Sequence, residues 1–350
     1  MNKFLKEIFE QPAAIEKVLA YYTGTDGRQS LEKVKSVLGK GEIAQIIFTG
    51  MGSSYFVSHA AATLFNALKI NSHVVNASEL LHYNLSLLER KTLLVCTSQS
   101  GESFEILEIL KQLPATVCCV GITNEEESTL ARKADIALFC KSGKEEMTST
   151  KTYVSTTLVA FILGWYLAGK WDDTKIERLE LLAQKFKTAL TDYEQWVNPV
   201  LDFLGDLNTL QIIARGPAFS TASQGALMFK EAVKIPATGI LGGEFRHGPM
   251  EMVGEGFKAM LIAGRGKTLD QSLKMAEDIA RFGGKVLLIT NAEIKFSIPQ
   301  VQICYVDEPD EYLFSVQGII PVQLFIDAYA KRRGLEAGSF SRGAKVTAIE

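Results

Sequence analysis

Three serines and a glutamine stand close together in Ser98-Gln99-Ser100-Gly101-Glu102-Ser103, directly after the apolar run 92–97. Hydroxyl groups, an amide and the free backbone N–H groups at the start of a helix can hold an anion without a positive side chain. The lysine of a P-loop is missing, so a small phosphate monoester fits better than a nucleoside triphosphate. An ordinary N-capping turn is the alternative, but capping needs fewer hydroxyl groups. We therefore expect Ser98, Gln99, Ser100 and Ser103 to bind a phosphate.

A second turn of this kind is Gly50-Met51-Gly52-Ser53-Ser54-Tyr55, which also follows an apolar run. It begins like the dinucleotide fingerprint GxGxxG, but Tyr55 occupies the sixth position, where a small residue must allow close helix packing. Glu79 could bind a ribose, yet a single partial match is weak evidence for NAD. We expect Ser53 and Ser54 to bind the substrate instead, and we expect no cofactor.

Two ionisable residues are candidates for moving protons. Glu231 follows the mostly apolar helical stretch 225–230, where a solvated glutamate at the end of a turn is the ordinary interpretation. His247 lies in the loop 242–249, which combines glycines, ionisable groups and a proline, and such loops carry function more often than core segments do. No pair among the four histidines has metal-ligand spacing, so we expect no metal site.

A lysine near the end of the sequence is a third candidate. Lysines in terminal segments are usually exposed to solvent. Lys345, however, is followed by Val346, Ala348 and Ile349, which suggest that the tail packs against the protein. A desolvated lysine amine can attack a carbonyl group and form a Schiff base.

The elements that must position these residues follow an α/β pattern. Short β-branched apolar runs alternate with helical stretches, which is typical of parallel strands buried on both faces. We expect strands at 44–49, 73–76, 92–97, 116–122, 136–140, 210–214, 259–262, 286–289 and 302–306. We expect helices at 55–68, 104–113, 224–233, 271–282 and 316–332. Ligands of such sheets bind beyond the carboxyl ends of the strands.

The middle of the sequence contains a repeat. Gln45-Ile46-Ile47 recurs 166 residues later as Gln211-Ile212-Ile213, and Gly121-Ile122-Thr123-Asn124 is echoed 167 residues later by Leu288-Ile289-Thr290-Asn291. We therefore expect two tandem doubly wound, flavodoxin-like parallel-sheet domains. The expected boundaries are an N-terminal helical segment 1–41, a first domain 42–169, a helical connector 170–206, a second domain 207–338 and a C-terminal tail 339–350.

Composition excludes several classes of protein. The chain has 350 residues and a formal net charge of −3, which gives neither the basic field of a nucleic-acid binder nor a polybasic membrane signal. The uncharged run 152–169 has a short apolar centre and favours a buried helix over a membrane span. Five cysteines form no CxxC pair, and the N-terminus has no secretory pattern. We expect a soluble, cytoplasmic protein that binds neither nucleic acid nor membranes.

These motifs, taken in order, resemble the sugar isomerase (SIS) family, and within it the isomerase half of glucosamine-6-phosphate synthases. The resemblance runs from about Glu7 to the last residue. It rests on six motifs: Gly52-Ser53-Ser54-Tyr55, Ser98-Gln99-Ser100-Gly101-Glu102-Ser103, Ser149-Thr150-Lys151, Lys230-Glu231, Gly243-Glu244-Phe245-Arg246-His247-Gly248-Pro249 and Lys345-Val346-Thr347.

The resemblance implies roles for the candidate residues. Glu231 would shuttle a proton between C1 and C2 of the sugar, and Lys345 would form the sugar imine. The loop 98–103, with Ser54, would hold the sugar phosphate. His247 would assist ring opening from the neighbouring subunit, which implies a homodimer or a larger homo-oligomer.

Departures from the family pattern narrow the expected function. Asn2 stands where the synthase has a nucleophilic cysteine, and only about 40 residues precede the first strand, so we expect no glutaminase domain in this chain. Met228 replaces a lysine common in the synthase, and Ser103 replaces a threonine. We expect a deaminase or deglycase that acts on a hexosamine or ketosamine 6-phosphate, releasing ammonia or an amino acid. The alternatives are a phosphosugar isomerase that leaves C–N bonds intact and a non-catalytic sugar-phosphate sensor.

Overall fold

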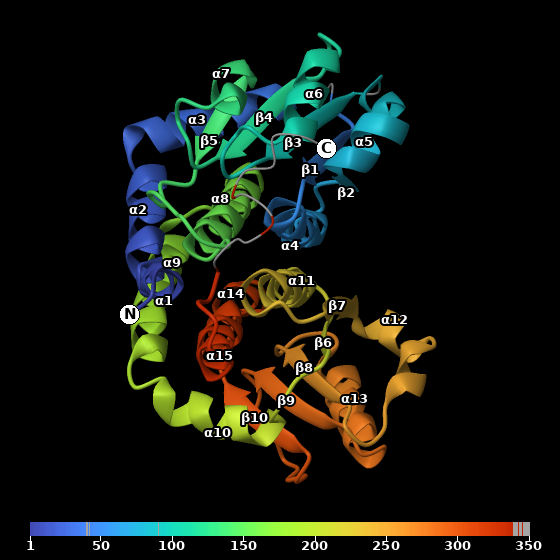
Figure 1. Ribbon diagram of the computed structural model, residues 1–350. Helices are drawn as coiled ribbons and strands as arrows, with labels where there is room; N and C mark the ends of the chain where they lie inside the picture. The colour runs from blue at the N-terminus through green and yellow to red at the C-terminus, as the bar shows by residue number, and fades with distance from the viewer. Residues whose placement is uncertain (40, 42, 90, 339–341, 343–344, 346–350) are drawn as a thin grey trace. The chain divides into compact units, whose positions relative to one another are not determined.

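The computed structural model describes residues 1–39, 41, 43–89, 91–338, 342 and 345 (Figure 1). The chain forms two compact units. The N-terminal unit comprises Glu10–Ala183 together with Ser341–Glu350, and the C-terminal unit comprises Gln184–Phe340 together with Met1–Phe9. Each unit contains one parallel sheet covered by helices.

The sheet of the N-terminal unit has five strands in the order β2-β1-β3-β4-β5, and every neighbouring pair is parallel. Its strands are β1 (Gln45–Gly50), β2 (Ser72–Asn76), β3 (Thr92–Thr97), β4 (Cys118–Thr123) and β5 (Ile136–Phe139). All six residues of the central strand β3 are buried. Helices on both faces explain why this strand is apolar throughout rather than alternating.

Two groups of helices cover this sheet. The first group, whose members pack on one another, consists of α2 (Gln11–Thr23), α3 (Thr25–Gly39), α4 (Ser53–Ala67) and α8 (Lys151–Leu167). The second group consists of α5 (Ala77–Tyr83), α6 (Phe104–Gln112) and α7 (Thr129–Lys133), and the short helix η1 (Leu85–Glu89) precedes β3. Residues 151–165 of α8 are all buried, so the uncharged run forms a core helix, as expected from the sequence.

The sheet of the C-terminal unit has the order β10-β9-β8-β6-β7, again parallel throughout. Its strands are β6 (Leu210–Ala214), β7 (Ala237–Leu241), β8 (Lys258–Ala263), β9 (Lys285–Thr290) and β10 (Val301–Tyr305). When these strands are counted from β6, the order is the same second–first–third–fourth–fifth order as in the other unit. The structure therefore contains the two doubly wound copies that the sequence repeat predicts.

The helices of this unit differ in detail from the expectation. They are α1 (Lys3–Phe9), α9 (Asp173–Leu190), which begins in the other unit, α10 (Glu194–Leu204), α11 (Ala218–Met228), η2 (Phe229–Val233), α12 (Gly242–Arg246), η3 (Pro249–Met252), α13 (Leu269–Arg281), α14 (Glu311–Gln317) and α15 (Ile319–Arg332). The expected helix 316–332 is two helices that meet at Gly318. The expected helix 224–233 begins earlier, at Ala218, and ends in a π-helical turn.

One helical stretch among the described residues, Glu311–Arg332, is long and apolar enough to cross a membrane, but 94% of its apolar window is buried inside the protein. Buried core helices of soluble proteins pass the same test. The domain boundaries expected from the sequence stay a prediction.

Candidate active site

The serine-rich stretch forms a tight loop between β3 and α6. Ser98 donates its backbone N–H to the carbonyl of Ile122 at 3.0 Å, so the loop continues the sheet towards β4. Gly101 has φ +66°, and a Cβ atom there would lie 2.1 Å from Ser128 Oγ, so only glycine fits. Glu102 Oε1 accepts the Thr129 N–H at 2.6 Å, so this carboxylate is occupied at the start of α7.

The hydroxyl groups of this loop are linked to one another and to its backbone. Ser98 Oγ accepts the Gly101 N–H at 3.1 Å and lies 3.0 Å from Ser103 Oγ, while Ser100 Oγ accepts the Glu102 N–H at 3.2 Å. Ser103 occupies the N-cap position of α6, but its side chain makes no capping bond. The backbone N–H groups at the start of α6 therefore have no side-chain cap, which disfavours the interpretation of the loop as an ordinary capping turn.

The second serine turn lies beside this loop. Gly52 has φ +51°, and α4 begins at the next residue, Ser53. A Cβ atom at Gly50 would lie 2.9 Å from both Ser54 Cβ and the carbonyl oxygen of Thr97, so Ser54 packs against the ends of β1 and β3. These two strands form the switch point of the order β2-β1-β3, where ligands of doubly wound sheets bind.

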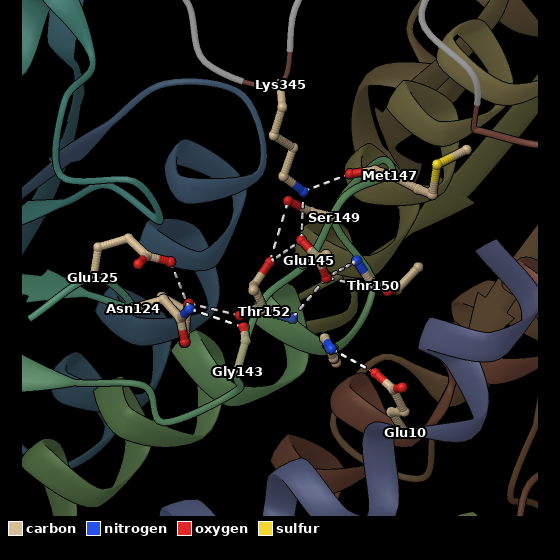
Figure 2. Close-up of polar contacts among 12 residues, drawn as sticks. Glu10, Asn124, Glu125, Gly143, Glu145, Met147, Ser149, Thr150, Thr152 and Lys345 are labelled. Atoms are coloured by element: carbon tan, nitrogen blue, oxygen red, sulfur yellow. Dashed lines mark hydrogen bonds and ion pairs between the residues drawn. The ribbon is translucent and has the colours of Figure 1, made fainter. Parts of the chain in front are cut away.

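Lys345 approaches a buried carboxylate of the same unit (Figure 2). Its amine lies 2.5 Å from Glu145 Oε2 and also donates to the carbonyl of Met147. The side chain of Lys345 is 21% exposed and that of Glu145 is fully buried. We expected apolar neighbours to desolvate this lysine, but Val346, Ala348 and Ile349 lie outside the described residues. The structure instead pairs the amine with an acid.

Glu145 is held by the start of α8. Its Oε1 accepts the Thr150 N–H at 2.9 Å, the Thr150 hydroxyl at 3.1 Å and the Thr152 N–H at 3.0 Å, and its Oε2 accepts the Thr152 hydroxyl at 2.5 Å (Figure 2). A carboxylate at a helix N-terminus satisfies free N–H groups and the helix dipole. Glu145 thus caps α8 and presents an oxygen to Lys345.

Lys151, which belongs to the motif Ser149-Thr150-Lys151, has a structural partner. Its amine lies 2.5 Å from Glu10 Oε2, and its side chain is 5% exposed. This ion pair, buried only on the lysine side, joins the first turn of α8 to the residue before α2. We assign no chemical step to Lys151.

Glu231 lies in the π-helical turn η2 of the C-terminal unit. Phe229, Ala232 and Val233 are buried, whereas Glu231 is partly exposed. The turn ends at Lys234, which has φ +60°. Single π turns inside helices occur often at functional sites because they widen the helix and redirect side chains.

His247 follows α12 and is exposed in this unit. Its neighbour Arg246 binds Asp278 Oδ2 at 2.7 Å, which ties α12 to α13. Glu231 precedes β7 and His247 follows it, so the five-residue strand, about 16 Å long, lies between them along the chain.

No pattern in the sequence predicted a role for Glu145. The residue stands in a polar loop between β5 and α8, five positions before Thr150, a spacing that matches no capping box. Its partner Lys345 is 200 residues away, so no local pattern could reveal the contact. Within the part of the chain that the structure describes, no cluster of three or more His, Cys, Asp or Glu residues could hold a metal ion.

Comparisons with known proteins agree with this fold. The family model for the SIS domain matches residues 42–163 and 204–324. A glutamine–fructose-6-phosphate aminotransferase from Methanothermobacter thermautotrophicus is 29% identical over 350 residues, which cover 99% of this chain and 57% of the relative. The chain therefore spans little more than half the length of this relative.

Solved structures have the same architecture. The C-terminal domain of glucosamine-fructose-6-phosphate aminotransferase from Francisella tularensis has a TM-score of 0.87 and 25% identity, covering 97% of this chain and 98% of that one. A glucosamine-6-phosphate deaminase from Thermotoga maritima has a TM-score of 0.72 and 20% identity, covering 98% of this chain and 99% of that one. The second likeness shows the fold alone.

Proposed function

We propose that this chain, which belongs to the SIS domain family, is a phosphosugar enzyme that isomerises a hexosamine or ketosamine 6-phosphate and then breaks its C–N bond. The observation that carries the proposal is the loop 98–103. It offers hydroxyl groups and uncapped helix N–H groups at the switch point of a doubly wound sheet, next to Ser54.

The loop fits a phosphate monoester because it is rich in donors. Glu102, the acidic residue of the loop, accepts the Thr129 N–H at the start of α7. Ser98, Ser100, Ser103, Gln99 and the turn Ser53-Ser54 would surround the phosphate with hydroxyl, amide and backbone donors. No lysine or arginine is required, because a helix N-terminus already favours an anion.

We assign the proton transfer to Glu231. For an aminoaldose, its carboxylate takes the proton from C2 and returns it to C1, which gives an imine at C2. For a ketosamine, the same carboxylate moves the proton from C1 to C2, and the imine forms at C1. His247, which follows β7 whereas Glu231 precedes it, would assist ring opening from a neighbouring subunit.

The pair Lys345–Glu145 suits the breaking of the C–N bond. Glu145 Oε2, at 2.5 Å, can take a proton from the Lys345 amine. The freed nitrogen attacks the imine carbon, a new C–N bond forms, and the substrate nitrogen leaves with a proton as ammonia or an amino acid. Water then hydrolyses the lysine imine, which releases a hexose 6-phosphate and restores the amine.

A product-resolved assay tests this function. The protein is incubated with glucosamine 6-phosphate and with fructosamine 6-phosphates, and ammonia, amino acid and hexose 6-phosphate are measured. Release of an amine with hexose 6-phosphate is expected. Interconversion of aldose and ketose phosphates without amine release would instead establish the plain isomerase, and binding without any product would establish a sensor.

Replacing the proton shuttle gives the first mutational prediction. Glu231→Gln should lower turnover by about 10²–10⁴-fold, because an amide cannot accept the proton from carbon. Binding of the sugar phosphate, measured by calorimetry, should persist. Glu255→Gln is the matched control, since Glu255 is an exposed carboxylate of the same unit. Normal turnover in Glu231→Gln would remove Glu231 from the mechanism.

A further inference from the structure

A cavity of about 580 Å³ lies in the C-terminal unit beside the edge strand β10. It is separate from the candidate residues of this unit, because Glu231 and His247 flank β7, the strand at the opposite edge of the same sheet. One water fills about 30 Å³ of liquid, whereas small-molecule pockets span about 300–1,000 Å³. The cavity therefore has the size of a ligand site rather than of a packing defect.

Most of its wall is apolar. Trp196, Pro199 and Val200 of α10 line the cavity, and Ile303 of β10 and Ile320 of α15 add aliphatic surface. An indole ring surrounded by aliphatic side chains can bind a branched or aromatic apolar group, because the apolar surfaces are removed from water. A ligand that fits this cavity should therefore have an apolar group at the end that contacts this wall.

The cavity also contains both signs of charge. The amine of Lys185, whose side chain is 13% exposed, lies 3.4 Å from Glu308 Oε2 and 3.8 Å from Asp307 Oδ1. Glu308 is 2% exposed and Asp307 is 90% exposed. The longer contact to an exposed carboxylate is weak, so Asp307 can bind a ligand cation while Lys185 binds a ligand anion.

We propose that this cavity binds a free α-amino acid with a large apolar side chain. The ligand ammonium group would meet Asp307, the ligand carboxylate would meet Lys185, and the side chain would pack against Trp196. An α-amino acid carries an anion, a cation with N–H donors and an apolar group on one carbon. The assignment is independent of the reaction proposed above.

Calorimetric titration of the whole chain with L-leucine tests the proposal. Saturable binding is expected, and it should weaken by about tenfold or more for isoamylamine and for 4-methylpentanoate, each of which lacks one charged group. L-Glutamate should not bind, because its side chain carries a charge into the apolar wall. Equal binding of leucine and both analogues would overturn the zwitterion assignment, and an absence of binding would overturn the site.

Two variants locate the site. Lys185→Met removes the ligand carboxylate partner, and Ala189→Phe fills the cavity from α9. Both should weaken leucine binding by about tenfold or more, while Lys187→Met, an exposed lysine on the same helix, should leave it unchanged. Circular dichroism confirms that each variant is folded. Leucine binding that survives in folded Ala189→Phe would place the amino acid elsewhere.

Discussion

Glu145 joins two features of the N-terminal unit, the start of α8 and the amine of Lys345. Its carboxylate accepts four hydrogen bonds from Thr150 and Thr152 and one from Lys345, and its side chain is fully buried. A buried carboxylate with this many donors is stable only while the donors are present. The same geometry that caps the helix therefore fixes the nitrogen proposed as the nucleophile.

Replacing this acid tests both roles. In Glu145→Gln the amide NH₂ would face a donor, so the free energy of unfolding should fall by about 3–5 kcal/mol. Borohydride trapping of an imine between Lys345 and a ketose 6-phosphate, followed by mass spectrometry, should also decrease. Glu146→Gln, at the exposed neighbouring carboxylate, is the control. Unchanged stability together with unchanged trapping would show that the contact is incidental.

At the level of single residues, a candidate site residue could be predicted from the sequence where the residues next to it in the chain form a recognisable motif. Ser98, Ser100 and Ser103 are recognisable because the loop is dense in hydroxyl groups. Glu145 was not recognisable, because its partner Lys345 is 200 residues away and only folding brings the two together. Long-range pairing of this kind has no signature in a single sequence.

At the level of elements, apolar runs predicted the strands of the described sheets within a few residues, with the exception of β7. That strand, Ala237–Leu241, lies at an edge and is only partly buried, and Gly239 approaches α11 so closely that a Cβ atom would lie 2.6 Å from Ser223 Cα. Its sequence therefore lacks the continuous apolar character of the central strands. The periodicity of apolar residues likewise did not predict the π-helical turn that contains Glu231.

The link between α12 and α13 gives a prediction about pH. Burial raises the pKa of Asp278, but the hydrogen bonds from Lys274 and Arg246 outweigh it, so the pKa lies below the usual value of 3.8. A carboxyl whose folded pKa is depressed stabilises the fold above its unfolded pKa, and this stability is lost as the pH falls through the folded pKa. The contribution of Asp278 is therefore fully present above about pH 4 and decreases as the pH falls towards the lowered folded pKa.

Urea unfolding between pH 3 and pH 7 measures this effect. Asp278→Asn should lower the free energy of unfolding at pH 7 by about 1 kcal/mol, because its partners Arg246, Lys274 and Arg281 are partly exposed. The difference from the unmodified protein should become smaller as the pH falls from 7 to 3. Glu277→Gln, a neighbouring exposed carboxylate on α13, serves as the control. A difference of the same size at pH 3 and at pH 7 would mean that the ion pairs do not cause it.

At the level of the whole chain, duplication produced two sheets of one topology with different loops. In the C-terminal unit the loop after β8 is Gly264-Arg265-Gly266-Lys267-Thr268, at the place of the serine loop. A Cβ atom at Gly266 would lie 2.3 Å from Glu311 Oε1, so the chain's own carboxylate rests against this loop. Burial raises the pKa of Glu311. The second copy thus places an internal carboxyl group where the first copy has the serine loop proposed to bind an external anion.

The separation of Glu231 from His247 by β7 leads to a prediction about assembly. If each active site combines Glu231 of one chain with His247 of a partner chain, Glu231→Gln and His247→Ala should complement each other. A mixed dimer then contains one site with both residues intact and one with both replaced. Random pairing of equal amounts should restore about a quarter of the full activity.

Co-expression of the two variants with different affinity tags allows the mixed dimer to be purified and assayed directly. The purified mixed dimer should reach about half of the full activity, because one of its two sites is intact. Each variant expressed alone is the control and should be nearly inactive. If Glu231 and His247 acted from the same chain, every site in the mixture would carry one defect and no activity would return. Activity in the mixed dimer would therefore show that Glu231 and His247 of one active site come from different chains. If both residues of a site came from one chain, each site would lack one of them and the mixed dimer would be inactive.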